Sequence, residues 1–246
     1  LHRGGRRFET GRAHPAGGSV RSVTATLADV IALLDRRYPP STAESWDAPG
    51  TVCGDPAQPV ERVLFAVDPT AAVVDEALAW GADLLVTHHP LFLRPVHSVA
   101  ATTYKGALVH RLIRGGCALH AAHTNADAAA GGVAEALATA VGLVDLVPLT
   151  PLERPVAGSD AAGGATGIGR VGRLPVPMSL RHFGEKVAAA IPATEQGVRI
   201  AGDLDGTVTT VAVVGGSGDS LFDAVRDAGV DAYVTADLRH HPASEL

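Results

Sequence analysis

The fold of this chain is decided by one apolar stretch that ends in two histidines, Ala82-Asp83-Leu84-Leu85-Val86-Thr87-His88-His89-Pro90. The residues Leu84 to Val86 are predicted to form a short buried strand, because the run is too brief for a helix and is bounded by Gly81 and Pro90. Side chains alternate between the two faces of a strand, so both histidines reach one site only if the chain turns there. Pro90 forces such a departure from regular strand pairing.

A second polar cluster follows another apolar run farther along the chain. The run 117–122 leads directly into His123-Thr124-Asn125-Ala126-Asp127. Ligands for a shared metal ion in an α/β protein converge from different strands at one edge of the sheet. Two strand ends that each supply His or Asp therefore predict a metal site.

Predicted strands and helices alternate along the chain, which favours an α/β fold with βαβ units and right-handed crossovers. The first predicted helix, over residues 26–38, ends at Pro39-Pro40. The expected strands are 63–67, 84–86, 118–122, 170–174, 198–200 and 208–214, and the further expected helices are 71–80, 105–115, 133–141 and 180–190.

Four segments are expected from the composition along the chain. Residues 1–22 are rich in Arg and Gly and lack an apolar segment, so they predict a disordered tail and no secretory signal. Residues 23–148 are predicted to form the α/β domain with the metal site, and residues 149–166, rich in Pro, Gly and Ala, a linker. Residues 167–246 are expected to form a second α/β segment, whose C-terminal part returns to the first domain.

An internal similarity indicates a duplicated unit. A shift of 148 positions aligns Gly81, Asp83 and Thr87 with their counterparts Gly229, Asp231 and Thr235 without a gap. Both copies are predicted to run strand, helix, Gly-x-Asp, strand, Thr, although unrelated βαβ units also resemble each other by chance. The two histidines fall opposite Ala236 and Asp237, so their chemistry belongs to the first copy or is divided between the copies.

Composition excludes several classes of protein. A net charge of −6 gives no basic surface for nucleic acid, so no nucleic-acid partner is expected. The sequence contains no apolar run of roughly 20 residues, so no membrane span is expected. Cys53 and Cys117 are too widely spaced for a disulfide framework, and a cytoplasmic location is predicted.

The residues His88, His89 and Asp127 are the predicted metal ligands. Imidazole and carboxylate groups suit a divalent ion such as Zn, Mn, Fe or Co. Asp127 has two oxygens that could bridge two ions, and each histidine could bind a different one. In the alternative interpretation, the histidines only end a strand and Asp127 caps the helix after Gly132, although paired histidines at an apolar strand end are costly without a partner.

Two further features have a functional and a structural interpretation. His123 could orient Asp127, or it could form a structural hydrogen bond with Thr124 or Asn125. The run Gly215-Gly216-Ser217-Gly218 could hold a phosphate at a helix N-terminus, but it lacks the full dinucleotide or P-loop pattern, which favours a tight turn.

Several motifs, in this order along the chain, resemble the Nif-three-like family, whose members are often named GTP cyclohydrolase I type 2 homologues. The similarity runs from about Thr24 to the end of the chain, and it rests on Glu44-Ser45-Trp46-Asp47, Gly54-Asp55-Pro56, Gly81-Ala82-Asp83, His88-His89-Pro90, His123-Thr124-Asn125-Ala126-Asp127 with Gly131-Gly132, Gly167-Ile168-Gly169-Arg170, Gly215-Gly216-Ser217-Gly218 and the segment 231–237.

The resemblance implies a two-domain α/β protein with mixed and parallel sheets, a toroidal homohexamer and a dinuclear centre. That centre would hold two divalent ions per subunit, Zn, Mn or Fe, with ligand roles for His88, His89 and Asp127. Family members close the centre with a C-terminal His-x-x-x-Glu. The pair His241 and Glu245 has this spacing, but it directly follows 235–237, which matches an earlier family segment. We therefore expect the closing pair beyond Leu246 and an incomplete centre in this polypeptide.

Two functions follow from this resemblance. The first is a metal-dependent hydrolase that opens the purine ring of GTP. The second is a non-catalytic regulatory protein that binds metal or nucleotide. The sequence identifies no general acid and no substrate pocket, so no catalytic residue is predicted.

Overall fold

The structure is a computed structural model that describes residues 6–9, 24–152 and 165–245. The chain forms two compact units, and the division falls between Ala126 and Asp127. The metal-site domain was expected to extend to residue 148. The helix α5 (Val133–Ala140) and the strand β6 (Val144–Val147) instead pack with later strands, which places the division earlier.

The first unit contains a mixed five-stranded sheet in the order β1-β3-β4-β5-β2. The central strands β3, β4 and β5 are parallel, and both edge strands are antiparallel to their neighbours. The strands are β1 (Arg6–Glu9), β2 (Gly50–Cys53), β3 (Arg62–Ala66), β4 (Leu84–Thr87) and β5 (Ala118–Ala121). The segment 6–9 therefore departs from the disordered tail expected over 1–22, because it pairs with β3.

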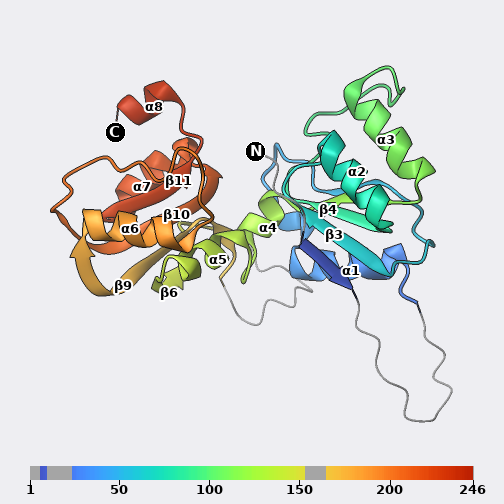
Figure 1. Ribbon diagram of the computed structural model, residues 1–246. Helices are drawn as coiled ribbons and strands as arrows, with labels where there is room; N and C mark the ends of the chain where they lie inside the picture. The colour runs from blue at the N-terminus through green and yellow to red at the C-terminus, as the bar shows by residue number, and fades with distance from the viewer. Residues whose placement is uncertain (1–5, 10–23, 153–164, 246) are drawn as a thin grey trace, which may run out of the picture. The chain divides into compact units, whose positions relative to one another are not determined.

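Helices cover both faces of this sheet (Figure 1). The helices α2 (Ala71–Trp80) and α3 (Tyr104–Arg114) bury Leu64, Leu85 and Leu119 on one face. On the other face, α1 (Leu27–Arg37) packs on Leu84, Val86 and Ala118. Adjacent residues of β4 thus belong to different cores, as strand alternation requires, and all four residues of β4 are buried.

The second unit contains a four-stranded sheet in the order β11-β10-β9-β6, in which only β10 and β11 are parallel. Its further elements are β9 (Arg170–Ser179), α6 (Leu180–Ala190), β10 (Thr207–Ser217), η2 (Asp219–Leu221), α7 (Phe222–Ala228), β11 (Ala232–Ala236), α8 (His240–Ser244) and the short pair β7 (Thr150–Pro151) and β8 (Gly167–Ile168). The helices α5 and α6 share one core with β9 and β10. The strand expected over 198–200 is wrong: these residues form no strand, although Val198 packs on that core.

The internal similarity of the sequence corresponds to a shared hydrogen-bonding motif. In β3-α2-β4, the Asp83 carboxylate accepts from the backbone N–H groups of Glu61 and Arg62, both at 2.9 Å. In β10-α7-β11, Asp231 accepts from Thr209 and Thr210 at 2.9 and 2.8 Å, and each of these residues lies 148 positions after its counterpart. We call this motif the aspartate clasp. Each clasp joins the start of one parallel strand to its neighbour.

A buried arginine organises the start of β9. Arg170 is 1% exposed. Its guanidinium donates hydrogen bonds to four backbone carbonyls, those of Ala129, Ala165, Gly167 and Gly169, at 2.7–3.5 Å. Burial lowers the pKa of Arg170, and nearby Glu135 opposes that effect. Arg170, the last residue of the Gly-Ile-Gly-Arg run, therefore holds several chain segments of the second unit together.

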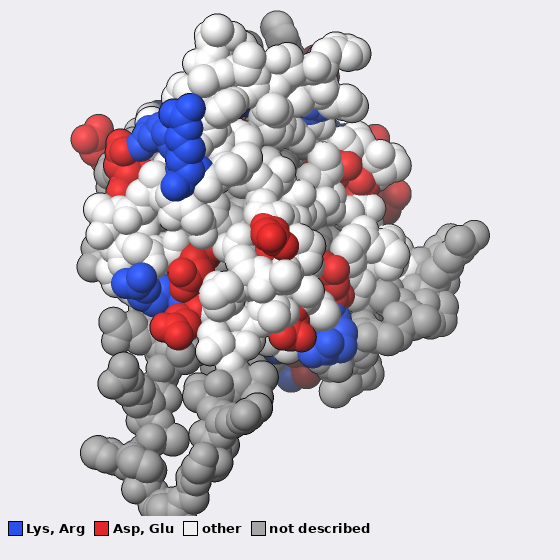
Figure 2. Space-filling view, turned by 90° about the vertical axis from the view of Figure 1, so that its right-hand side faces the viewer, with Lys and Arg blue, Asp and Glu red and all other residues white. Residues whose placement is uncertain are grey.

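The charged residues do not gather into one surface on the face shown in Figure 2. Lys and Arg side chains occur there in separate places between Asp and Glu side chains, and most of the face is uncharged. Among the described residues, no helix has the length and apolarity needed to cross a membrane.

Candidate metal site

The two histidines at the end of β4 lie next to the end of β5. His88 and His89 follow Thr87, the last residue of β4, and their backbone N–H groups donate hydrogen bonds to carbonyls at the end of β3. His123 follows β5 by two residues. Because β4 and β5 are parallel, their carboxyl ends share one edge of the sheet.

Three imidazoles meet at this edge. Each of His88, His89 and His123 offers one nitrogen atom, and these three atoms lie within 4.8 Å of one another. The ring centroids are 5.1 Å apart for His88–His89 and His88–His123, and 5.6 Å apart for His89–His123. We call these residues the three-histidine group. Imidazole nitrogens at such spacing can bind one divalent ion.

Each imidazole of the group is oriented by a hydrogen bond at Nδ1. The partners are Ala122 O for His88 at 3.1 Å, Asp68 Oδ1 for His89 at 2.7 Å and Asp47 Oδ1 for His123 at 2.8 Å. Carbonyl and carboxylate oxygens accept, so Nδ1 donates in all three pairs. A neutral imidazole protonated at Nδ1 keeps its lone pair on Nε2, and this arrangement is typical of metal-binding histidines.

Asp47 is the most extensively bonded carboxylate beside the group. Its side chain is fully buried (0% exposed), and it also accepts hydrogen bonds from the backbone N–H and the hydroxyl of Thr124. Burial alone would raise the pKa of Asp47, but the hydrogen bonds from His123 and Thr124 outweigh burial and hold the pKa below its usual value. An ionised Asp47 therefore fixes His123 in place.

The group combines a buried and an open side. Burial, followed by the nearby His123 and His89, lowers the pKa of His88 to about 4. His88 is therefore neutral at pH 7, as a ligand must be. The side chain of His89 is 48% exposed, so solvent and small molecules reach the group from its side.

Asp127, the third predicted ligand, is half-buried in the short helix α4 (Thr124–Ala128). The division between the two units falls within this helix, directly before Asp127. The alternative role as a helix cap is not observed, because Gly132 caps α5 without a side-chain hydrogen bond. The role of Asp127 as a metal ligand stays a prediction.

The structure adds residues that the sequence analysis did not select. His123 was expected to orient Asp127, to bond locally or to handle a proton, and not to be a ligand, yet its ring is the third member of the group. Its backbone N–H does donate to Asn125 Oδ1, at 2.8 Å. Asp47 belongs to a family motif for which the sequence predicts no role, and the sequence predicts no role for Asp68 either. The only sequence signal for Asp68 is that it is an acidic residue just after a predicted strand.

The glycine-rich run at the end of β10 forms a close-packed turn. Gly218 O accepts from the hydroxyl of Tyr233 at 3.0 Å, and Gly216 O accepts from that of Thr235 at 2.9 Å. A Cβ on Gly218 would lie 2.0 Å from the Tyr233 hydroxyl oxygen, so any other residue there would displace the Tyr233 side chain. This packing accounts for Gly218, and the positive φ of Gly216 (68°) accounts for that glycine, in both cases without a bound phosphate.

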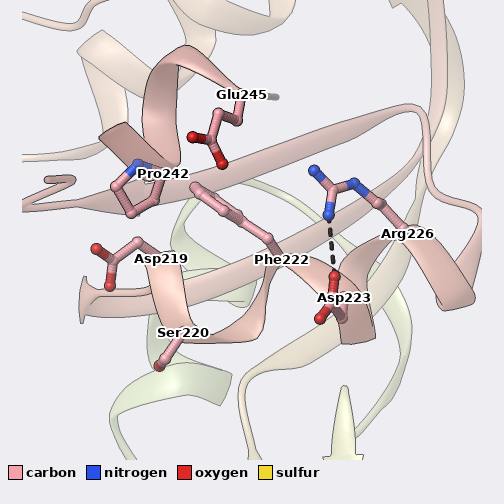
Figure 3. Close-up of a pocket in the computed structure, with 7 residues that line it drawn as sticks. All are labelled: Asp219, Ser220, Phe222, Asp223, Arg226, Pro242 and Glu245. Carbon is pink, nitrogen blue, oxygen red and sulfur yellow. Dashed lines mark hydrogen bonds and ion pairs between the residues drawn. The ribbon is translucent and has the colours of Figure 1, made fainter. Parts of the chain in front are cut away.

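A small cavity in the second unit offers no comparable chemistry (Figure 3). Its volume is about 190 Å³, and its lining comes from η2, α7 and the segment around α8: Asp219, Ser220, Phe222, Asp223, Arg226, Pro242 and Glu245. Ligand sites usually have at least about 300 Å³. Arg226, the one cation of the lining, forms an ion pair with Asp223 at 2.9 Å.

Comparison with known proteins is consistent across sequence and structure. A Streptomyces coelicolor protein named GTP cyclohydrolase 1 type 2 homolog is 58% identical over 219 residues, which cover 89% of this chain and 75% of that protein. A Mycobacterium tuberculosis protein of the same name is 40% identical and covers 91% of this chain and 84% of its own length.

Two solved structures share the fold. The structure of a Bacillus cereus protein related to NIF3 has a TM-score of 0.81 and 25% identity, and the match covers 91% of this chain and 85% of that one. A Staphylococcus aureus protein has a TM-score of 0.77 and 29% identity over 90% of this chain and 82% of its own. The model of one family matches residues 25–246. On this match and these relatives, the chain belongs to the Duf34/NIF3 (NGG1p interacting factor 3) family.

Proposed function

We propose that the three-histidine group, with Asp127 as a further ligand, forms a centre for divalent metal ions, two per subunit where the centre is complete, in a hydrolase that opens the purine ring of GTP. One observation carries the metal-binding part. Three imidazoles meet at one edge of the sheet, where one nitrogen atom of each lies within 4.8 Å of the others, and each ring is oriented by an acceptor at Nδ1.

The donor set fits a divalent ion of borderline character. Nitrogen ligands with a carboxylate suit Zn, Mn or Fe. A divalent ion supplies Lewis acidity, which activates water and polarises an electrophilic carbon. The chain's own residues orient the ligands: Asp47 holds His123, Asp68 holds His89 and the Ala122 carbonyl holds His88.

The substrate part of the proposal draws on the relatives. Proteins that are 58% and 40% identical carry the name GTP cyclohydrolase 1 type 2 homolog. Hydrolytic opening of the purine ring at its one-carbon position releases formate. The open side of the group at His89 admits a small-molecule substrate.

Metal content tests the first part directly. Purified protein loaded with Zn, Mn or Fe(II) and then dialysed is expected to retain metal by elemental analysis. The double variant His88→Ala/His123→Ala is expected to retain less than a tenth of that metal, because two of three imidazoles are lost. His97→Ala, which removes an exposed histidine outside the group, serves as the matched control. Equal metal content in all three proteins would refute the site.

Formate release tests the catalytic part. Metal-loaded protein with GTP is expected to form formate, and the double variant or a chelator should abolish it. Metal retention without formate would contradict the hydrolase and support the second candidate, a regulatory protein that binds metal or nucleotide.

We also propose, from the family resemblance, that the protein assembles as a homohexamer in the cytoplasm. Cys53 and Cys117 are both free thiols, which fits a reducing compartment.

A further inference from the structure

An exposed tryptophan lies beside the three-histidine group. Trp46 is 57% exposed, and its ring centroid lies 6.0 Å from that of His123 in an edge-to-face arrangement, at 80° between the ring planes. Tryptophan is highly buried on average, because exposing an indole forgoes a large hydrophobic gain. Nothing in the metal-binding proposal requires an aromatic ring at this position.

The backbone that carries Trp46 is held firmly. Residues 44–47 form a turn, closed by a hydrogen bond from the Asp47 N–H to Glu44 O at 3.0 Å. Both ends of the turn are bonded to Thr124. The Glu44 N–H donates to the Thr124 hydroxyl at 3.0 Å, and the Thr124 N–H donates to Asp47 Oδ2 at 3.0 Å. The indole is thus exposed at the tip of a turn whose two ends are anchored.

This arrangement prepares a binding surface before a ligand arrives. The carboxylate nearest in the chain, Asp47, is fully buried and bonded to His123 and Thr124, so it is not available to a ligand at the tip. The exposed indole offers a flat apolar surface on which an aromatic group can stack. Anchoring reduces the conformational entropy lost when such a group binds.

We propose that Trp46 stacks on a planar heteroaromatic ring of the molecule that binds at the three-histidine group. The inference rests on the proposed function only for the identity of that ring, a purine. Trp46 is then the residue that selects ring-containing ligands, whereas the imidazoles hold the metal.

Three probes separate ring recognition from phosphate recognition: GTP, guanosine, which has the ring alone, and tripolyphosphate, which has the phosphates alone. Dissociation constants are measured by calorimetry on metal-loaded wild type, Trp46→Ala, Trp46→Phe and the control Tyr104→Ala. Tyr104 is similarly exposed (60%) but lies on α3. Trp46→Ala is expected to weaken the binding of GTP and guanosine about ten-fold, as typical base-stacking energies imply, and to leave the affinity for tripolyphosphate unchanged. Trp46→Phe should keep most of the affinity.

Fluorescence gives a second, independent measurement. The chain has two tryptophans, so Trp80→Phe leaves Trp46 as the only one, and guanosine should quench its emission. Absence of guanosine binding to wild type, or an equal loss for tripolyphosphate in Trp46→Ala, would overturn the inference. Elemental analysis of Trp46→Ala should show unchanged metal. A protein that binds guanosine through Trp46 but retains no metal would sink the proposed function and leave this inference standing.

Discussion

Among the residues that orient the imidazoles, Asp47 is expected to have the largest effect on metal affinity. It orients His123 and is bonded to Thr124 at the same time. Removing its charge by Asp47→Asn should allow the imidazole to change tautomer or rotate. We predict metal affinity 10- to 100-fold weaker, the usual effect of losing such a partner.

Competition with a chromogenic chelator measures this change. Asp145→Asn is the matched control, because Asp145 pairs with Arg173 and not with an imidazole. Circular dichroism confirms that both variants are folded. An affinity of Asp47→Asn within two-fold of wild type would show that the carboxylate does not orient the ligand.

His120 should affect stability and not metal binding. It is 2% exposed in β5, its Nδ1 lies 3.2 Å from the Thr51 hydroxyl, and burial lowers its pKa below 6.5. Below pH 6.5 the unfolded chain therefore takes up a proton at His120 that the folded chain does not. This uptake favours unfolding, so its effect is absent above pH 6.5 and grows as the pH falls.

We predict that the free energy of unfolding falls less for His120→Gln than for wild type when the pH is lowered from 7.5 to 5.5. Urea denaturation at several pH values, with a chelator present to remove metal, measures how the free energy of unfolding of each protein depends on pH. The same pH dependence of the free energy of unfolding in the two proteins would contradict a neutral, buried His120.

At the scale of elements, the two aspartate clasps should act locally and alike. Asp83→Ala and Asp231→Ala each remove an acceptor of two backbone N–H groups. We predict a loss of about 1 kcal/mol in the unit that carries the change, a low value because solvent reaches both sites. Hydrogen exchange should rise in β3 and β4 for the first variant and in β10 and β11 for the second. Faster exchange in both units for either variant would contradict a local role.

The sequence predicted the central elements because their patterns are strong and local. The predicted strands 63–67, 84–86 and 118–122 correspond to β3, β4 and β5. Their residues form continuous apolar runs, as buried parallel strands do. The edge strand β2 was missed, since it is only four residues long and none of them is fully buried. Residues 198–200 were wrongly predicted: they form a loop in which Val198 packs on the core while Arg199 and Ile200 are exposed, unlike the fully buried residues of β4.

The site was predicted in part for the same reason. Adjacent His88 and His89 are visible in the sequence, but the place of His123 depends on Asp47, which lies 76 residues away. Such long-range partners leave no periodic signal. The Gly-x-Asp pattern is visible in both copies, but the hydrogen bonds of the clasp come from the structure, where each aspartate accepts from the neighbouring strand of its own copy.

At the scale of the whole molecule, the proposed homohexamer gives a prediction of mass. Native mass spectrometry and light scattering should report six protomers, as the family resemblance implies. The measurement should be made with and without metal, and at several protein concentrations. A monomer under all of these conditions would contradict the assembly.

The repeated clasp also gives the chain an internal reference. A change of temperature, pH or denaturant concentration should change the stability of β4 and β11 alike, because the same clasp bonds join each strand to its neighbour. His88 and His89 directly follow β4, whereas Ala236 and Asp237 occupy the equivalent positions of the second copy. When metal is added, slower amide exchange after β4 but not after β11 in one sample therefore indicates metal binding at the histidines. Equally slower exchange at both strands indicates general stabilisation of the protein.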